Sequence, residues 1–360
     1  SLIAGVIIML SFIRSSLATT TIRFMSFYSG KKDFQMLNKI FNNSVTTQFL
    51  ISFVIVLFLI IIETFLFNGF LNIPIDRIDT AKLVYRLMIV TVFITMQSIP
   101  FYAVLIAHEN IIFTSIVQVI EVSFKLPIIY ALLHTSFDKL IVYSSLLVCA
   151  QILTFLLYYT YCKKKYVETQ KIKILDFDKG IFIEMFSFSG WVLYSTGCVV
   201  GRTQGIALLL NNFFGAAINA AYGIAWQVTG QVSFLSSSLM NAINPQIIKA
   251  EGENNRMKML RFSEMASKFS FLFLAVVCIP AVIEMDSILS LWLKDVPMHT
   301  SLLCQFILLT NLSDQLTIGL VTANKAIGNI KNYSLTINSI KILTVPSAYL
   351  CLMINLPLIS

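Results

Sequence analysis

The stretch FLISFVIVLFLIII, residues 49–62, contains no charged side chain and only one polar side chain, Ser52. It lies inside a longer apolar segment that runs from about residue 45 to about residue 67. A helix that crosses the hydrocarbon core of a bilayer needs about 20 mostly apolar residues. The segment is long enough, and it predicts a transmembrane helix.

The rest of the chain repeats this pattern. The 360 residues are 57% apolar and 12% charged, whereas a soluble domain carries about 25% charged residues. Strands of a membrane barrel would be about ten residues long and alternating, which these segments are not. We therefore predict an all-α polytopic membrane protein with helices near residues 2–22, 45–67, 83–107, 111–133, 140–161, 186–210, 216–240, 266–284, 299–322 and 334–355.

Basic residues gather in every second loop. Four loops, near residues 23–39, 163–179, 249–268 and 325–331, hold 17 of the 26 Lys and Arg residues. The intervening loops hold five. The positive-inside rule places the basic loops in the cytoplasm. The net charge of +8 is thus explained by membrane topology, and nucleic acid is not an expected partner.

An internal repeat indicates two lobes. Residues 15–37 align without gaps to residues 237–259, with a Ser-Ser-Leu start and a glycine in common, and both copies close a helix before a basic loop. Six segments separate the copies, which predicts two six-helix lobes. We assign residues 1–161 to an N-terminal lobe, 162–185 to a basic cytoplasmic linker and 186–360 to a C-terminal lobe. Both chain ends lie in apolar stretches, so we expect a piece of a longer protein.

Motifs of soluble enzymes are missing from the sequence. It has no Gly-rich phosphate loop, and the His108-Glu109 pair lacks the second histidine of a zinc-protease helix, because position 112 is Ile. The six cysteines are scattered without paired spacing and read as small apolar packing residues. We expect neither catalysis nor a bound metal.

Ionisable residues inside the apolar segments are the candidate functional groups, since such residues usually face a bundle interior or a wet cavity. Glu121 and Lys125 are four residues apart and share a helix face. They either neutralise each other as a structural pair or face a hydrated cavity in which the lysine meets an anionic substrate. The sequence leaves both readings open.

Arg202 has no acidic residue within one helical turn and lies in GCVVGRTQG, residues 197–205. The glycines at every fourth position allow another helix to approach closely, so the arginine lies on a helix that packs against protein. Its planar fork suits phosphate oxygens. Arg14 and Lys341 are further cavity cations or, equally, snorkelling residues. Glu121, Asp314, Gln204 and Gln227 are candidate polar or ion-coupling groups. Glu63, like Asp314 a lone acid, either binds a coupling ion or is merely interfacial, and its closeness to the outer surface favours the interfacial position.

Several short stretches resemble the polysaccharide-repeat-unit flippases, which belong to the multidrug/oligosaccharidyl-lipid/polysaccharide (MOP) exporter superfamily. The pattern is most similar to O-antigen and capsule flippases of the Bacteroides type, and the resemblance covers nearly the whole chain. It rests on IAHEN (106–110), EVSFKL (121–126), FSFSGWVL (186–193), NNFFGAAINAAYGIAWQVTGQV (211–232), NAINPQIIKAEGE (241–253) and ANKAIGNIKNY (323–333).

The resemblance implies two six-helix lobes around a central cavity, with the first helix and the last helices of a full member lying outside this chain. It implies a multi-pass protein of the bacterial inner membrane that moves an undecaprenyl-pyrophosphate-linked oligosaccharide outward by alternating access. Polysaccharide polymerase machinery would be a partner, and a coupling ion, H⁺ or Na⁺, would replace any cofactor. By residue type, Lys125 and Arg202 fit the pyrophosphate best.

Three rival functions remain. A cation or multidrug antiporter of the same fold would favour an acidic, aromatic cavity. A membrane glycosyltransferase would need catalytic carboxylates and a large outer loop, and the outer loops here are short. A peptidoglycan-precursor flippase would differ only in the head group that it carries.

Overall fold

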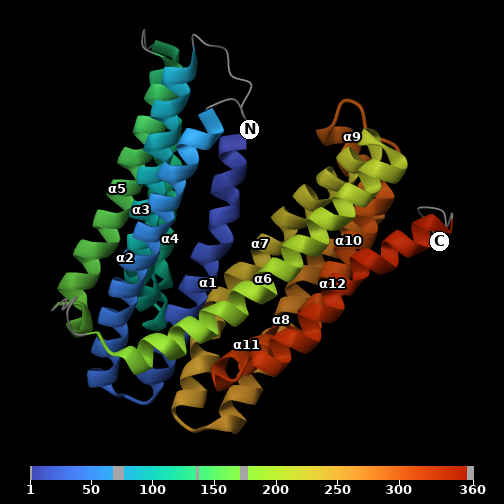
Figure 1. Cartoon of the computed structure of the whole chain (residues 1–360). Helices are drawn as coiled ribbons and strands as arrows, with labels where there is room; N and C mark the ends of the chain where they lie inside the picture. Colours follow the sequence, from blue (N-terminus) through green and yellow to red (C-terminus); the bar gives the residue numbers. More distant parts are fainter. Residues whose placement is uncertain (1, 68–76, 135–137, 171–176, 355–360) are drawn as a thin grey trace. The chain divides into compact units, whose positions relative to one another are not determined.

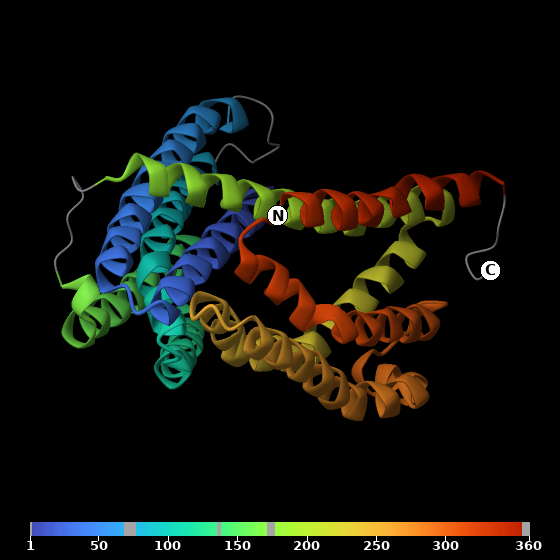
Figure 2. The ribbon, with the colours of Figure 1, turned by 90° about the horizontal axis from the view of Figure 1, so that it is seen from below.

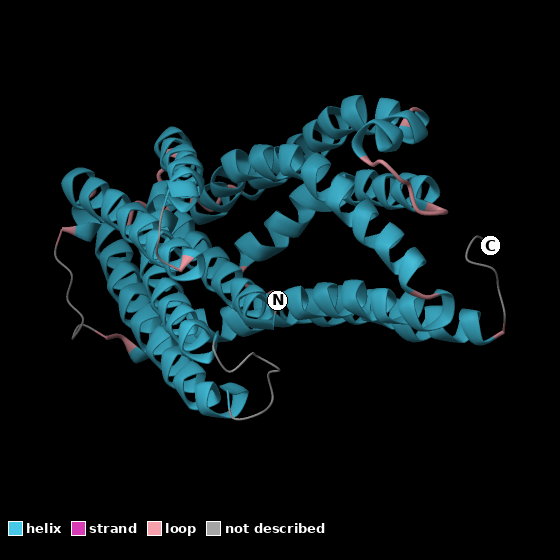
Figure 3. Cartoon of the chain, turned by 90° about the horizontal axis from the view of Figure 1, so that it is seen from above, coloured by secondary structure: helices cyan, strands magenta, loops and turns pink. Residues whose placement is uncertain are grey.

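The computed structural model describes residues 2–67, 77–134, 138–170 and 177–354. Side chains are described for these residues except 2–11, 125–126, 128–129, 131 and 133–134. Every regular element in the described part is a helix, and no strand occurs there (Figure 3). The prediction of an all-α fold is confirmed.

The chain divides into two compact units, residues 1–189 and 190–360. In the first unit, α3 contacts α1, α2, α4 and α5 and so lies at the centre of the packing (Figure 1). The elements of this unit are α1 (Leu2–Gly30), α2 (Phe34–Phe65), α3 (Ile78–Ala107), α4 (Ile111–His134), α5 (Lys139–Lys165), the 3-10 turn η3 (Val167–Thr169) and the start of α6 (Lys179–Phe214).

The second unit begins inside α6, between Ser189 and Gly190. Here α7 and α8 pack along each other, and both contact α10 and α11. The elements after α6 are α7 (Ala216–Gly252), α8 (Arg256–Ile283), α9 (Met285–Trp292), α10 (Thr300–Asp314), the 3-10 turn η4 (Gln315–Thr317), α11 (Ile318–Ile327) and α12 (Lys331–Met353).

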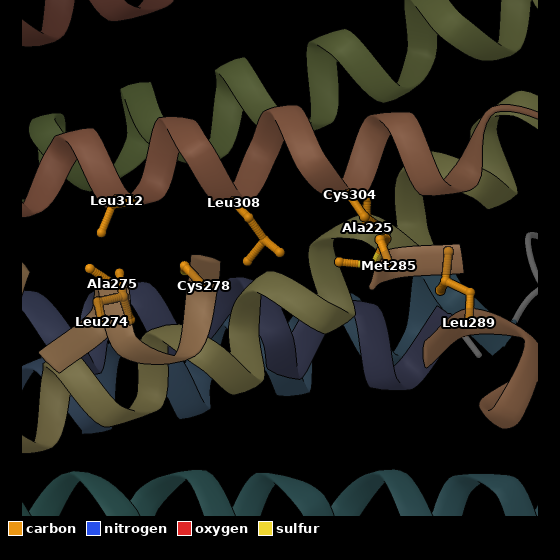
Figure 4. Close-up of a cluster of buried hydrophobic side chains, with 9 residues drawn as sticks. All are labelled: Ala225, Leu274, Ala275, Cys278, Met285, Leu289, Cys304, Leu308 and Leu312. Carbon is orange, nitrogen blue, oxygen red and sulfur yellow. The ribbon is translucent and has the colours of Figure 1, made fainter. Parts of the chain in front are cut away.

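Apolar side chains hold each unit together. In the second unit, a buried cluster joins α7, α8, α9 and α10, and Figure 4 shows Leu308 and Leu312 of α10 pointing toward the α8 side chains. Cys278 and Cys304 belong to this cluster as free thiols, in the packing role predicted for them. In the first unit, Leu17 of α1 packs against buried α3 side chains.

Six described helices, taking α10 to α11 as one, are long and apolar enough to cross a membrane. They are α2, α3, α5, α8, α10–α11 and α12. α7 is 37 residues long but is not among them, because Gln, Ser, Asn and Gly interrupt its apolar sequence. The prediction of a multi-span membrane protein is confirmed.

The helices extend beyond the apolar segments at the end that carries the basic loops. The segment predicted from residue 45 belongs to a helix that starts at Phe34, and the one predicted to end near residue 240 continues to Gly252. These extensions bury residues such as Leu37 and Ile247, so they are held by packing between protein helices and not by lipid. A hydropathy pattern detects only the apolar part of each helix.

The segment predicted over 299–322 is not one helix. It breaks into α10, η4 and α11 around Gln315, whose side chain hydrogen-bonds to Ser236 of α7 and to the backbone oxygen of Asn311 at 3.1 Å. A buried glutamine needs such partners, and these contacts hold the short 3-10 stretch in place.

The two copies of the internal repeat end their helices in the same way. α1 ends at Gly30 and α7 at Gly252, and in each case a three-residue turn leads into the next helix. Asp33 caps α2 by accepting from the backbone N–H of Met36 at 3.0 Å, and Asn255 caps α8 by accepting from Lys258 at the same distance. An N-cap acceptor satisfies one of the free N–H groups of the first turn.

Candidate functional site

The helix that carries Arg202 packs closely against α12, and the two run side by side in Figure 2. A Cβ atom on Gly201 or Gly205 would lie 3.0 Å from the side chains of Ile342 or Val345. The glycines therefore allow the close approach that was predicted for them, and α12 is the helix that approaches.

Arg202 itself is half-buried on α6. Its charge interacts with the phenol of Tyr222 on α7, whose ring meets that of Trp226 edge to face at 6.1 Å between centroids. Within the described residues, Arg202 has no ion-pair partner. The second unit thus holds a cation that no carboxylate among the described residues neutralises.

Two further candidates lie on the same pair of helices. Lys341 is half-buried on α12, next to Ile342, and Gln204 is exposed on α6. Hydrogen bonds from Asn338 to Ser195 at 2.8 Å and between Tyr194 and Ser339 at 2.7 Å join α12 to α6. Lys341 and Gln204 are therefore placed on a well-fastened helix pair.

In the first unit, Arg14 and Glu121 are brought to one region. Arg14 is exposed on α1 and Glu121 is half-buried on α4. Both charges act on the phenol of Tyr158, and Arg14 acts also on Tyr102, whose ring lies 6.1 Å from that of Tyr158. The side chain of Lys125 lies outside the described residues, so the choice between the two readings of the Glu121–Lys125 pair stays open.

The two lone acids of the sequence have different surroundings. Asp314 is exposed at the end of α10, where the helix breaks. Glu63 is 8% exposed and forms an ion pair with Arg86 of α3. Arg86 Nε donates to Glu63 Oε1 at 3.0 Å, and Arg86 Nη2 lies 2.9 Å from the same oxygen. Glu63 is thus a buried member of an ion pair and not a lone acid, while its interfacial position stays a prediction.

The sequence reasoning missed the exposed face of α7. Residues at helical spacing along this membrane-length helix are exposed and carry amide, hydroxyl or no side chain, with one aromatic ring among them. They are Gly223, Gln227, Gly230, Gln231, Phe234, Ser238 and Asn241, named here the α7 polar face. Of these, only Gln227 was among the predicted site residues. The period of three and four residues was visible in the sequence and could have found the others.

The α7 polar face differs from the face that α2 exposes. The exposed side chains of α2 include Phe53, Val54, Phe58 and Ile61, which suit hydrocarbon. An exposed amide in lipid would leave its donors and acceptors without partners, which is costly. α7 therefore exposes a surface fit for water or a polar ligand.

No cluster of three metal-binding side chains occurs among the described residues. No protein-family model matches the sequence. No curated protein matches it either.

Solved transporter structures do match the fold. The crystal structure of a mutant MATE transporter superposes with a TM-score of 0.84 at 14% identity, over 96% of this chain and 78% of that one. The Vibrio cholerae MATE transporter VcmN in its bent form gives 0.80 at 13% identity, over 95% and 77%. A MOP superfamily transporter from Pyrococcus furiosus gives 0.79 at 13% identity, over 97% and 79%. This chain has the fold of the MATE and MOP superfamily transporters.

Proposed function

We propose that this protein is a flippase of the bacterial inner membrane, which moves an oligosaccharide repeat unit linked to undecaprenyl pyrophosphate across the bilayer. The unit would then be used to build a surface polysaccharide such as O-antigen. The α7 polar face carries the proposal, because it offers uncharged hydrogen-bonding groups along a helix of a transporter fold.

A sugar chain is a good match for that surface. Gln and Asn amides and Ser hydroxyls both donate and accept hydrogen bonds, as sugar hydroxyls do. Phe234, which is 66% exposed, offers an apolar ring to a sugar face. A hydrophobic drug would gain little from the amides, whereas an oligosaccharide would keep its hydroxyls satisfied while it crosses.

The cations supply the second part of the argument. Apart from the paired Glu63 and Arg86, the candidate cations Arg14, Lys125, Arg202 and Lys341 outnumber the candidate acids Glu121 and Asp314. A pyrophosphate carries negative charge into a medium in which an unpaired charge is costly. The guanidinium of Arg202 can meet two phosphate oxygens with two parallel donors, while the polyprenyl tail stays in lipid.

Transport would proceed by alternating access, in which one unit moves against the other. An inward gradient of H⁺ or Na⁺ would drive the cycle, and Asp314 and Glu121 are the acids available to such an ion. Partners would be the lipid-linked oligosaccharide, the bilayer and the polysaccharide polymerase machinery that uses the flipped unit.

The test is complementation of a flippase-deficient strain. Arg202→Ala should abolish surface polysaccharide while the protein still reaches the membrane, because a charge-assisted hydrogen bond contributes about 1.5–3 kcal/mol, or roughly 10–150-fold in affinity. Arg202→Lys should retain part of the activity. Arg261→Ala, which removes an exposed arginine of α8 near a basic loop, is the control and should transport normally. Normal transport by Arg202→Ala would remove Arg202 from the substrate path.

Complementation of other deficient strains distinguishes the rival substrates. One similar structure, the Pyrococcus furiosus transporter, is described as having a binding pocket of reverse polarity that suggests a different function, so this fold carries pockets of more than one polarity. A multidrug antiporter would restore drug resistance and not polysaccharide. A peptidoglycan-precursor flippase would rescue growth of a strain that lacks that activity.

A further inference from the structure

A small cavity of about 10 Å³ lies within the first unit, between α1, α2 and the first turns of α6. Its polar walls carry hydroxyl and amide groups, and no charged side chain lines it. The polar lining residues are Thr20, Thr21, Ser44, Thr47, Gln48 and Ser189.

Most of these groups are satisfied by one another. Ser189 Oγ donates to Thr20 Oγ1 at 2.8 Å, and Thr20 Oγ1 donates to the backbone oxygen of Ser16 at 3.0 Å. Ser16 Oγ in turn donates to the backbone oxygen of Ser189 at 2.7 Å. Thr21 and Ser44 share a hydrogen bond of 3.0 Å. Side chains of α1 thus hold α6 and α2.

Two groups have no protein partner. Thr47 Oγ1 and Gln48 Oε1 find none among the described residues. Both side chains line the cavity, and their residues are only 5% and 1% exposed. Buried polar atoms are rarely left unpaired, and a bound water or ion is one explanation for an unpaired one.

The polar side chains that line the cavity determine which ligand it can bind. Gln48 Oε1 can only accept a hydrogen bond, whereas the Thr47 hydroxyl can also donate one. The bound species must therefore donate a hydrogen bond and can also accept one. A cavity of this size holds a single water molecule. A cation is disfavoured because no carboxylate lines the cavity and because Arg23, which is 5% exposed, follows Thr20 by one turn. We propose that this cavity binds one structural water, held by Thr47 and Gln48.

The place of the site suggests what the water does. Ser189 is the last residue of the first unit, and α6 continues without a break into the second. A water can exchange hydrogen-bond partners with little loss. It therefore lets the α6 segment shift against α1 and α2 during transport without leaving buried oxygens unpaired.

The sign of a stability change tests the proposal. Thr47→Val removes a partner of the water and should lower the melting temperature of the purified protein by about 2–4 °C, while Thr47→Ser should behave as wild type. Thr154→Val is the matched control, because Thr154 is also buried and its hydroxyl only donates to its own helix at 3.1 Å. A higher melting temperature for Thr47→Val would show a dry cavity and overturn the proposal.

Radiolytic footprinting tests it in the unaltered protein. Met185 lines the cavity and is 4% exposed, so radicals formed from a trapped water should oxidise it. Met285, which is fully buried in the apolar cluster of the second unit, should stay intact. Equal protection of the two would rule out the water. A melting temperature that rises with Na⁺, at constant ionic strength, and no longer does so in Gln48→Met would replace the water with a cation.

Discussion

Lys32 and Asn254, which stand 222 residues apart, share a left-handed backbone conformation, with φ angles of 57° and 58°. Each is the middle residue of a three-residue turn with the same pattern of backbone hydrogen bonds. His108, Glu109 and Asn110 form a third copy between α3 and α4, with φ of 59° at Glu109. The fold thus reuses one turn at the end that carries the basic loops.

Glycine at position 32 should give a more stable protein than lysine does. A side chain in the left-handed region costs roughly 1–2 kcal/mol, and Asn is among the residues that tolerate it. Lys32→Gly should therefore raise the free energy of unfolding by up to about 1 kcal/mol, and Asn254→Gly should raise it less, as measured by thermal unfolding in detergent. Lys31→Gly is the control: Lys31 has no positive φ and lies over the ring of Phe27 at 4.7 Å. Destabilisation by Lys32→Gly would contradict the inference that the backbone of Lys32 is strained.

The Glu63–Arg86 pair should matter for stability and not for ion coupling. Arg86→Ala leaves a buried carboxylate without its partner, which should cost about 1–3 kcal/mol of unfolding free energy. Lys258→Ala breaks an exposed pair with Glu253 and should cost about 0–1 kcal/mol. Transport by the surviving Arg86→Ala protein should keep its ion dependence. If that dependence disappeared, Glu63 would regain a role as a coupling acid.

The sequence was sufficient to predict the apolar segments and the repeat, because lipid exposure and turn chemistry are local properties. It could not show that Glu63 meets Arg86, since the two lie 23 positions apart on different helices. It could not show the break at Gln315 either, because that depends on a partner in α7. Hydropathy identifies the apolar segments that a bilayer requires, whereas the contacts between helices depend on packing and cannot be read from it.

The same limit applies to the candidate site. Charge in an apolar segment is conspicuous, so Arg14, Glu121 and Arg202 could be selected by inspection. The polar face of α7 was harder to see, because neutral amides and glycines interrupt an apolar pattern only mildly. Its meaning depends on exposure, and exposure requires the fold.

Acid should loosen the first unit at Glu168, which lies outside the membrane-spanning helices. Burial acts to raise the pKa of this carboxyl, but hydrogen bonds from His108 at 2.5 Å and from the backbone, together with the His108 charge, lower the pKa below its ordinary value of 4.5. A lowered pKa stabilises the fold above about pH 4.5, and that contribution is lost as the pH falls further. Melting temperatures from pH 6 to 3.5 should fall for the wild type.

Glu168→Gln isolates this effect. The amide cannot titrate, so the variant should start less stable and lose less on acidification than the wild type. Glu253→Gln, which alters an exposed carboxylate, should follow the wild-type curve. Parallel curves for wild type and Glu168→Gln would mean that other carboxyls dominate the acid response.

Gly319 should tolerate no side chain. A methyl group there would overlap the backbone of Ser263 on α8, and the Gly319 N–H donates to Ser267 Oγ at 3.0 Å. Because the obstacle is backbone, α8 and α11 would have to separate, and Gly319→Ala should destabilise the second unit by about 1–3 kcal/mol. At Gly223, by contrast, a Cβ atom meets nothing within 4 Å. Gly223→Ala should raise stability by up to about 1 kcal/mol through helix propensity.

A substitution at Gly230 tests transport independently of folding. A Cβ atom at this position also meets nothing within 4 Å, and the residue lies between Gln227 and Gln231 on the α7 polar face. Gly230→Leu should fold at least as well as the wild type, because leucine is a good helix former. Its side chain would cover the amides, so polysaccharide export should fall several-fold at equal protein level. Val276→Leu adds bulk to an exposed apolar position of α8 and should export normally. Normal export by Gly230→Leu would exclude the α7 polar face from the substrate path, and a lower melting temperature would mean that another part of the protein packs there.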